Sequence, residues 1–187
     1  TAWHREGKVE LLAESEGMTE QQMEQLDEIY GHAGACRKLN KSLLLLSRIE
    51  NGQYTEMEDV SVDEILDELL PDLMDIYEHK QVRLIRKREE QPFIIRCNHS
   101  LAQILVSNLV KNSLLHNREG GELQVFTTPA SLVIRNTGDA PLDGEKLFRR
   151  FYHGMDGKKD STGLGLAIAR SIALSSSLSS RMNGRTV

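Results

Sequence analysis

The feature that most constrains this fold is a long helical stretch with a narrow apolar stripe that it cannot bury by itself. Apolar side chains recur at three- and four-residue spacing for about thirty residues and stop at Asn51-Gly52, a typical helix end. They are Met23, Leu26, Tyr30, Ala33, Leu43, Leu46 and Ile49. Such a narrow stripe has to be buried against another surface.

A second helix is expected just before this one. Trp3 to Glu16 are mostly good helix formers, and Thr19 and Gln22 then have the spacing of a capping box. Two helices joined by a short turn make an antiparallel hairpin, and two hairpins make a four-helix bundle. We therefore expect residues 1–54 to form a dimerization hairpin and the chain to be a homodimer. The alternative is that the hairpin packs on its own globular domain.

Residues 55–187 are expected to form a separate α+β domain. Helical patterns cover 62–77, where Pro71 is expected to kink or split the helix, 101–117 after a cap at Asn98 or Ser100, and 164–174. Strand patterns cover 82–88, 93–96, 122–128 and 132–136, and two weaker ones lie in the tail. This order predicts one mixed sheet with helices on one face, a two-layer α/β sandwich.

Composition excludes several classes of protein. The net charge of −5 argues against general nucleic-acid binding, and 39% hydrophobic with 27% charged residues is typical of a globular chain. No apolar run approaches the roughly 20 residues that span a bilayer. Cys36 and Cys97 lack metal-ligand spacing, and we expect two reduced, mostly buried thiols.

Three motifs could carry chemistry. Asn108, Asn112 and His116 share one face of the predicted helix 101–117. Amides on an apolar helix are costly unless they are satisfied, so these bond to neighbouring backbone, lie on the solvent side or face a ligand.

The second motif is Asn136-Thr137-Gly138, which follows a predicted strand. A side-chain amide beside a glycine can read a flat heterocycle at close range, although the same residues also form ordinary turns.

The third motif is a glycine pair at the mouth of an apolar helix. It begins at Thr162 and continues through Gly163, Leu164 and Gly165. Backbone N–H groups at such a helix start bind anions, and the upstream Lys158 and Lys159 would suit a polyphosphate. The alternative is a helix capped by Thr162, with glycines for tight packing.

In this order, the motifs resemble those of a bacterial sensor histidine kinase core of the GHKL ATP-binding superfamily. The segment Asn108–Ser113 is similar to the N box, Asn136–Gly138 to the first glycine box, Phe148–Phe151 to the F box and Thr162–Ile168 to the second glycine box. The segment Leu43–Gly52 resembles the end of the second dimerization helix.

The resemblance implies ATP and Mg²⁺ as cofactors. Asn112 would bind Mg²⁺, and Asn108 and His116 would face the phosphates. Asn136 would contact the adenine amino group, and Gly138 would lie beneath the ring. The remaining nucleotide-binding positions implied are Phe151, Thr162, Gly163, Leu164 and Gly165, with Lys158 and Lys159 in a lid over residues 152–162. Such kinases transfer the γ-phosphoryl group to a histidine and then to a response-regulator aspartate.

Some residues depart from the family pattern. Asn136 stands where the family usually has an aspartate, Leu115 where a lysine is common, and His153 where an arginine commonly begins the lid. His4 lacks the acidic residue and the proline that follow the phosphoacceptor. We therefore expect the acceptor to lie just upstream of Thr1, in a membrane-anchored parent on the cytoplasmic side of the bacterial inner membrane.

Two other functions stay open. One is a degenerate module that dimerises, or binds ATP, without catalysis. The other is a different GHKL ATPase, which would use a glutamate four residues before the metal-binding asparagine. Here that position is Asn108, which cannot act as a general base.

Overall fold

The computed structural model of the protein describes residues 19–138, 147–151 and 163–176. The chain divides into two compact units, residues 1–43 and residues 44–187. The proposed functional boundary between residues 54 and 55 is a different division and stays a prediction. The expected helix from Trp3 to Glu16 and the two tail strands lie outside the described residues.

Helix α2 (Glu20–Glu50) begins and ends where the sequence predicts. The capping box is present, because the Thr19 N–H donates to Gln22 Oε1 at 2.9 Å and the Gln22 N–H donates to Thr19 Oγ1 at 3.3 Å. At the other end, Gly52 has a φ of 63°, a conformation that glycine adopts without strain. None of the helices in the described ranges combines the length and apolar character that a membrane span needs.

Helix α3 (Val62–Ile76) corrects one expectation. Pro71 lies inside it and does not split it. The reason is that Pro71 is exposed, so the carbonyl group that loses its N–H partner can bond to water instead. Ile76, within the predicted helix 62–77, is 65% exposed. The buried apolar stripe consists of Val62, Ile65, Leu66, Leu70 and Leu73.

The strands form two sheets within the described residues, where the sequence predicted one. Strand β1 (Glu58–Ser61) pairs antiparallel with β3 (Ile94–Cys97). The second sheet has the order β2 (Arg83–Arg88), β4 (Glu122–Thr128), β5 (Ser131–Asn136), with β2 parallel and β5 antiparallel to β4. Strand β1 was not predicted, because its sequence Glu-Asp-Val-Ser shows little apolar alternation.

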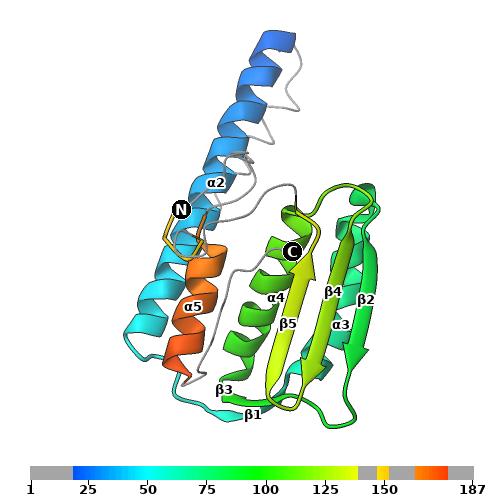
Figure 1. Ribbon diagram of the computed structural model, residues 1–187. Coiled ribbons are helices and arrows are strands. Elements are labelled where there is room, and N and C mark those ends of the chain that lie inside the picture. Colours follow the sequence, from blue (N-terminus) through cyan, green and yellow to red (C-terminus); the bar gives the residue numbers. More distant parts are fainter. Residues whose placement is uncertain (1–18, 139–146, 152–162, 177–187) are drawn as a thin grey trace. The chain divides into compact units, whose positions relative to one another are not determined.

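Helices cover one face of the three-stranded sheet, as expected. Figure 1 shows α3 and α4 (His99–Leu115) behind it, with α5 (Gly165–Ser175) beside α4. Asn98 caps α4, since its Oδ1 accepts from the Leu101 N–H at 3.3 Å. The core between these elements is aliphatic and includes Leu66, Leu101, Leu114, Leu123, Val125, Leu164 and Ile172. The two-layer α+β fold class is therefore confirmed.

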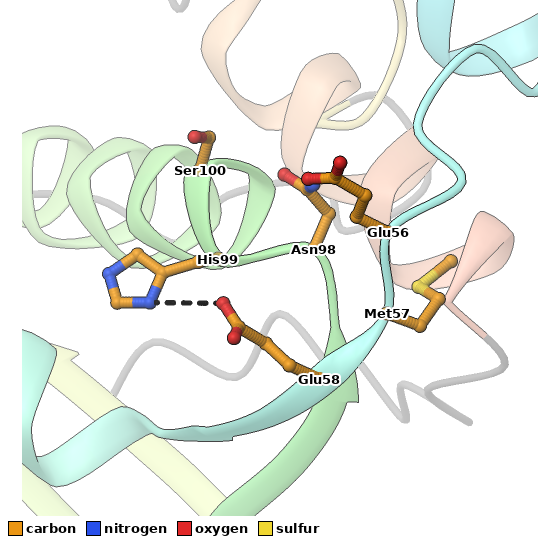
Figure 2. A pocket seen from close by; sticks show the side chains of 6 residues that line it. All are labelled: Glu56, Met57, Glu58, Asn98, His99 and Ser100. Carbon is orange, nitrogen blue, oxygen red and sulfur yellow. Dashed lines mark ion pairs between the residues drawn. The ribbon is translucent and has the colours of Figure 1, made fainter.

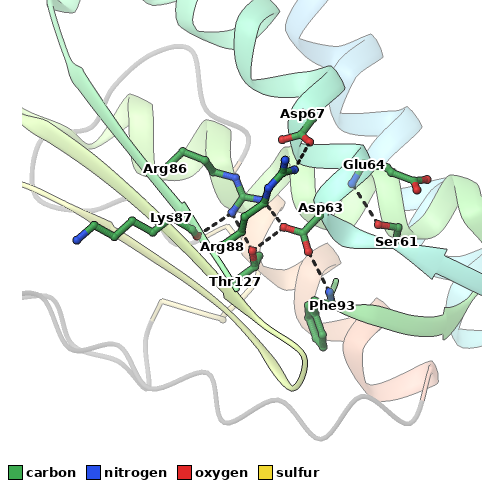
Figure 3. A network of polar contacts seen from close by, with 9 residues as sticks. All are labelled: Ser61, Asp63, Glu64, Asp67, Arg86, Lys87, Arg88, Phe93 and Thr127. Atoms are coloured by element: carbon green, nitrogen blue, oxygen red, sulfur yellow. Dashed lines mark hydrogen bonds and ion pairs between the residues drawn. The ribbon is translucent and has the colours of Figure 1, made fainter. Parts of the chain in front are cut away.

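A buried ionic cluster ties the two sheets to α3 (Figure 3). Asp63 forms an ion pair with Arg86 of β2, accepts from Thr127 Oγ1 of β4 at 2.5 Å, and accepts from the Phe93 N–H at 2.9 Å. Burial raises the pKa of Asp63, but the hydrogen bonds from Thr127, Phe93 and Arg86 together outweigh it, so the pKa lies below its ordinary value.

The two cysteines differ in exposure. Both are free thiols, Cys97 fully buried and Cys36 exposed on α2, so the expectation that both are buried is wrong for Cys36. Cys97 Sγ lies 3.1 Å from Oγ of Ser176, which directly follows α5. Strand β3 and the end of α5 therefore meet at this thiol.

Candidate functional site

Helix α4 carries the first predicted motif on a face that is not fully buried. Asn108, Asn112 and His116 are all half-buried, and they follow one another at four-residue spacing. The opposite side of the helix packs in the core through Leu101, Ala102, Leu105, Val106, Val110 and Leu114. The core packing therefore fixes the direction in which the three polar side chains point.

The second glycine box meets this helix at Asn108. A Cβ atom placed on Gly165 would lie 3.4 Å from Asn108 Oδ1 and 3.8 Å from its Cγ. Any larger side chain at position 165 would press on the amide. The N-box helix and the start of α5, which are more than fifty residues apart in the sequence, are thus brought into contact.

The first glycine box joins the other end of the same face. The Asn136 amide donates from Nδ2 to the carbonyl oxygen of His116 at 3.2 Å. The next residue, Thr137, accepts from the Arg118 N–H at 3.1 Å and, through Oγ1, from the Glu122 N–H at 3.0 Å. Gly138 follows and is half-buried. The end of β5 is therefore fastened to the end of α4.

Glu122 is a charged residue close to that junction. A hydrogen bond from Gln124 and the nearby charge of Arg83 hold the pKa of Glu122 below its usual range. Its carboxylate is therefore ionised at neutral pH, which leaves it paired with Arg83 at 2.5 Å.

Phe151 and Gly163 are joined across the predicted lid. The Phe151 N–H donates to the Gly163 carbonyl at 3.0 Å, and both residues have a positive φ, 62° and 64°. A bulky residue in this conformation is strained and points to a functional constraint. Leu164 is fully buried, so of that residue only the backbone can reach a ligand. Thr162, Lys158, Lys159 and His4 lie outside the described residues.

The start of α5 has the properties of an anion site. Leu164 occupies its N-cap position and makes no side-chain capping hydrogen bond. The first N–H groups of a helix have no partner within the helix, and they attract anions when no side chain caps them.

Sequence reasoning missed two residues at the end of α4. Lys80, which ends the short 3-10 helix η1 (Glu78–Lys80), donates from Nζ to the carbonyl groups of Leu114 and Asn117 at 2.8 and 3.1 Å. Asn117 is 4% exposed and donates from Nδ2 to the Glu122 carbonyl at 3.0 Å. Neither belongs to a motif, and no local pattern could have linked Lys80 to a helix end 34 residues away.

A further pocket lies at the opposite end of α4 (Figure 2). It measures about 440 Å³ and is lined by Glu56, Met57, Glu58, Asn98, His99 and Ser100. Glu58 and His99 approach within 3.6 Å. A helix rises about 1.5 Å per residue, which puts Asn112 roughly 20 Å from His99. The two glutamates would also repel phosphates, so this pocket is not the predicted site.

The comparisons with known proteins show what the second part of the chain is similar to. Residues 98–186, just under half of the chain, match the family model of the histidine kinase-, DNA gyrase B-, and HSP90-like ATPases. The matched range includes the three motifs around Asn108, Asn136 and Gly165.

Curated relatives of this chain are bacterial sensor proteins. This chain is 26% identical over 154 residues to the heme sensor protein HssS of Staphylococcus saprophyticus, covering 79% of this chain and 33% of the relative. It is 32% identical over 145 residues to the sensor protein CutS of Streptomyces coelicolor, covering 72% and 34%. The chain thus spans about a third of the length of these relatives. The resemblance to sensor histidine kinases is confirmed.

Solved structures agree on the fold. The Acinetobacter baumannii histidine kinase AdeS has a TM-score of 0.63 at 19% identity, covering 91% of this chain and 81% of that one. The catalytic domain of the histidine kinase ThkA has a TM-score of 0.56 at 19% identity, covering 65% and 82%. The roles of the individual site residues stay predictions.

Proposed function

We propose that this chain is the dimerization and ATP-binding part of a two-component sensor histidine kinase. The observation that carries the proposal is the contact between Asn108 of α4 and Gly165 of α5. It places an amide-bearing helix face beside an uncapped helix start, an arrangement that suits a metal-chelated polyphosphate.

The site residues have distinct roles in this proposal. Asn112 binds Mg²⁺ through its side-chain oxygen, and Asn108 and His116 face the phosphates. Asn136 reads the adenine amino group, with Gly138 under the ring. The backbone of Gly163–Gly165 binds phosphate oxygens, and Phe151, Thr162, Lys158 and Lys159 complete the enclosure. When bound, Mg²⁺ neutralises phosphate charge, and this chain supplies the positioning.

The reaction in the parent protein is transfer of the γ-phosphoryl group to a histidine. The bond from the γ-phosphorus to the bridging oxygen breaks, a bond to an imidazole nitrogen forms, and ADP leaves. We place the acceptor upstream of Thr1, in a membrane-anchored parent whose cytoplasmic partner is a response-regulator receiver domain. A chain extended upstream should form an acid-labile phosphohistidine. Free ATP hydrolysis without a phosphoenzyme would contradict the kinase proposal.

The nucleotide site is tested by titrating a non-hydrolysable ATP analogue by calorimetry, with and without Mg²⁺. The wild-type chain should bind saturably and more tightly with Mg²⁺. Gly165→Val should weaken binding at least about tenfold, because the added side chain displaces Asn108 and a tenfold change needs only about 1.4 kcal/mol. Asn112→Ala should remove most of the advantage that Mg²⁺ gives.

Gly31→Val is the control, because a Cβ at Gly31 in α2 meets nothing within 4 Å. It should bind as the wild type does. Absence of binding by folded wild-type protein would refute the proposed site and favour a dimeric scaffold.

We also propose that α2 takes part in a homodimer. Its large apolar side chains are unusually exposed in the single chain: Met23 45%, Ile29 58%, Tyr30 41%, Leu43 38% and Leu44 55%. A second hairpin would bury them in a four-helix bundle. Sedimentation equilibrium measures this directly, and a monomer at micromolar concentration would contradict it.

A further inference from the structure

A lysine from another element holds the end of α4. Nζ of Lys80 donates to the carbonyl oxygens of Leu114, Leu115 and Asn117 at 2.8, 2.5 and 3.1 Å. The last carbonyls of a helix have no partner within the helix, and a cation is favourable there. Helix α4 has no basic residue in its own last turn. Lys80 therefore supplies the charge that this helix end lacks.

The backbone of Lys80 holds the other end of the same loop. Its carbonyl accepts from the Gly120 N–H at 2.9 Å, and the Gly121 carbonyl accepts from the Arg83 N–H at 2.9 Å. The chain between α4 and β4 is thus fastened at its start by the Lys80 side chain and near its end by the Lys80 main chain. The loop has little freedom to move as long as the lysine is in place.

This loop in turn orients Asn136. The carbonyl that accepts from Asn136 Nδ2 belongs to His116, which lies between Leu115 and Asn117, two residues whose carbonyls Lys80 binds. A carbonyl oxygen can only accept, so the Nδ2 end of the amide faces His116 and the Oδ1 end is turned the other way. The chain of contacts therefore runs from Lys80 through His116 to the amide of Asn136.

We propose that Lys80 is a positioning residue of the nucleotide site, which fixes the end of α4 so that Asn136 presents its Oδ1 oxygen to the base. The proposal rests on the proposed function, in which Asn136 contacts the adenine amino group. An oxygen acceptor favours the 6-amino group of adenine and repels the 6-oxo group of guanine. Lys80 thereby acts on the choice of base without touching the nucleotide.

The first test needs no nucleotide. The side-chain amide resonances of Asn136, assigned by their loss in Asn136→Ala, are compared by NMR in the wild type and in Lys80→Met. The methionine keeps the chain length and removes the charge and the donors. The Asn136 resonances should shift or broaden in Lys80→Met. Lys87→Met is the matched control, because Lys87 is exposed on β2 with its Nζ over the Phe126 ring at 5.9 Å from the centroid, and it should leave them unchanged.

The second test measures the ratio of GTP-analogue to ATP-analogue dissociation constants. Lys80→Met should lower this ratio at least fivefold, about the lower end of typical coupling effects, while Lys87→Met keeps it. If Lys80→Met does not fold, Lys80→Gln takes its place, since it retains N–H donors on a shorter, neutral side chain. Unchanged Asn136 resonances, or an unchanged ratio in a protein that binds ATP, would overturn the role of Lys80. Failure of the wild type to bind ATP would overturn the proposed function instead.

Discussion

Replacing Asp63 by alanine is expected to lower the free energy of unfolding by about 3–5 kcal/mol, the usual cost of breaking a buried ion pair from one side. Asp63 is 5% exposed, and it receives hydrogen bonds from Thr127, Phe93 and Arg86. Its loss leaves the half-buried Arg86 guanidinium without its counter-charge, and Arg86 Nε already lacks a partner among the described residues. Urea denaturation followed by circular dichroism measures the change.

The same two elements provide the matched control. Asp67 lies one turn further along α3 and pairs with Arg88 of β2 at 2.8 Å, but the two side chains are 52% and 60% exposed. Exposed pairs contribute about 0–1 kcal/mol, so Asp67→Ala should have little effect on the urea concentration at the unfolding midpoint. Equal losses of unfolding free energy for the two variants would show that burial does not set how much each ion pair stabilises the fold.

The contribution of Asp63 should also depend on pH. Its pKa is lower in the folded protein than in the unfolded chain, so its stabilisation is complete above the unfolded pKa of about 3.9. The stabilisation is lost as the pH falls through the folded pKa. The difference between wild type and Asp63→Ala should therefore be constant near neutral pH and shrink below about pH 4. A difference that persists in acid would point to packing instead.

Asn136→Asp is the second change with a large expected effect, although it introduces the residue that is usual in the family. A carboxylate cannot donate to the His116 carbonyl, which Asn136 Nδ2 approaches at 3.2 Å, so two acceptors would face each other. We expect the free energy of unfolding to fall by about 1–3 kcal/mol at neutral pH. Affinity for the ATP analogue should fall about tenfold or more, since a tenfold change in the dissociation constant needs only about 1.4 kcal/mol.

Asn136→Ala separates the loss of the hydrogen-bond donor from the introduction of a negative charge. Alanine removes the donor and adds no charge, so at neutral pH it should be less destabilising than aspartate. The facing carbonyl favours the protonated form of the new carboxyl group, so the folded pKa is raised and the penalty should fade as the pH falls through it. An aspartate variant as stable as wild type at neutral pH would contradict the assigned orientation of the amide.

Local signals made the ends of the elements predictable. The capping box at Thr19 and Gln22 and the stop at Gly52 depend on residues within one turn of each other, and both were predicted correctly. The cap at Asn98 is of the same kind. The meeting of Asn108 with Gly165 followed from the resemblance, because nothing in the spacing of two distant motifs fixes their contact.

Features that depend on distant partners were not predictable from the sequence. Strand β1 exists because β3 pairs with it, and its own residues carry little strand pattern. The continuity of α3 through Pro71 depends on which face of the helix meets solvent. Lys80 looks like any surface lysine in the sequence, and only the fold brings it to the end of α4.

The two thiols of this chain provide a built-in measure of local opening. Cys97 is fully buried against Ser176, whereas Cys36 is exposed and should react with a thiol reagent at once. Opening of the contact between Ser176 and β3 exposes Cys97, so a slow labelling phase reports this opening. Under the proposed function, the same helix carries the phosphate-binding glycine box at its start, which makes Cys97 a probe of a helix that borders the nucleotide.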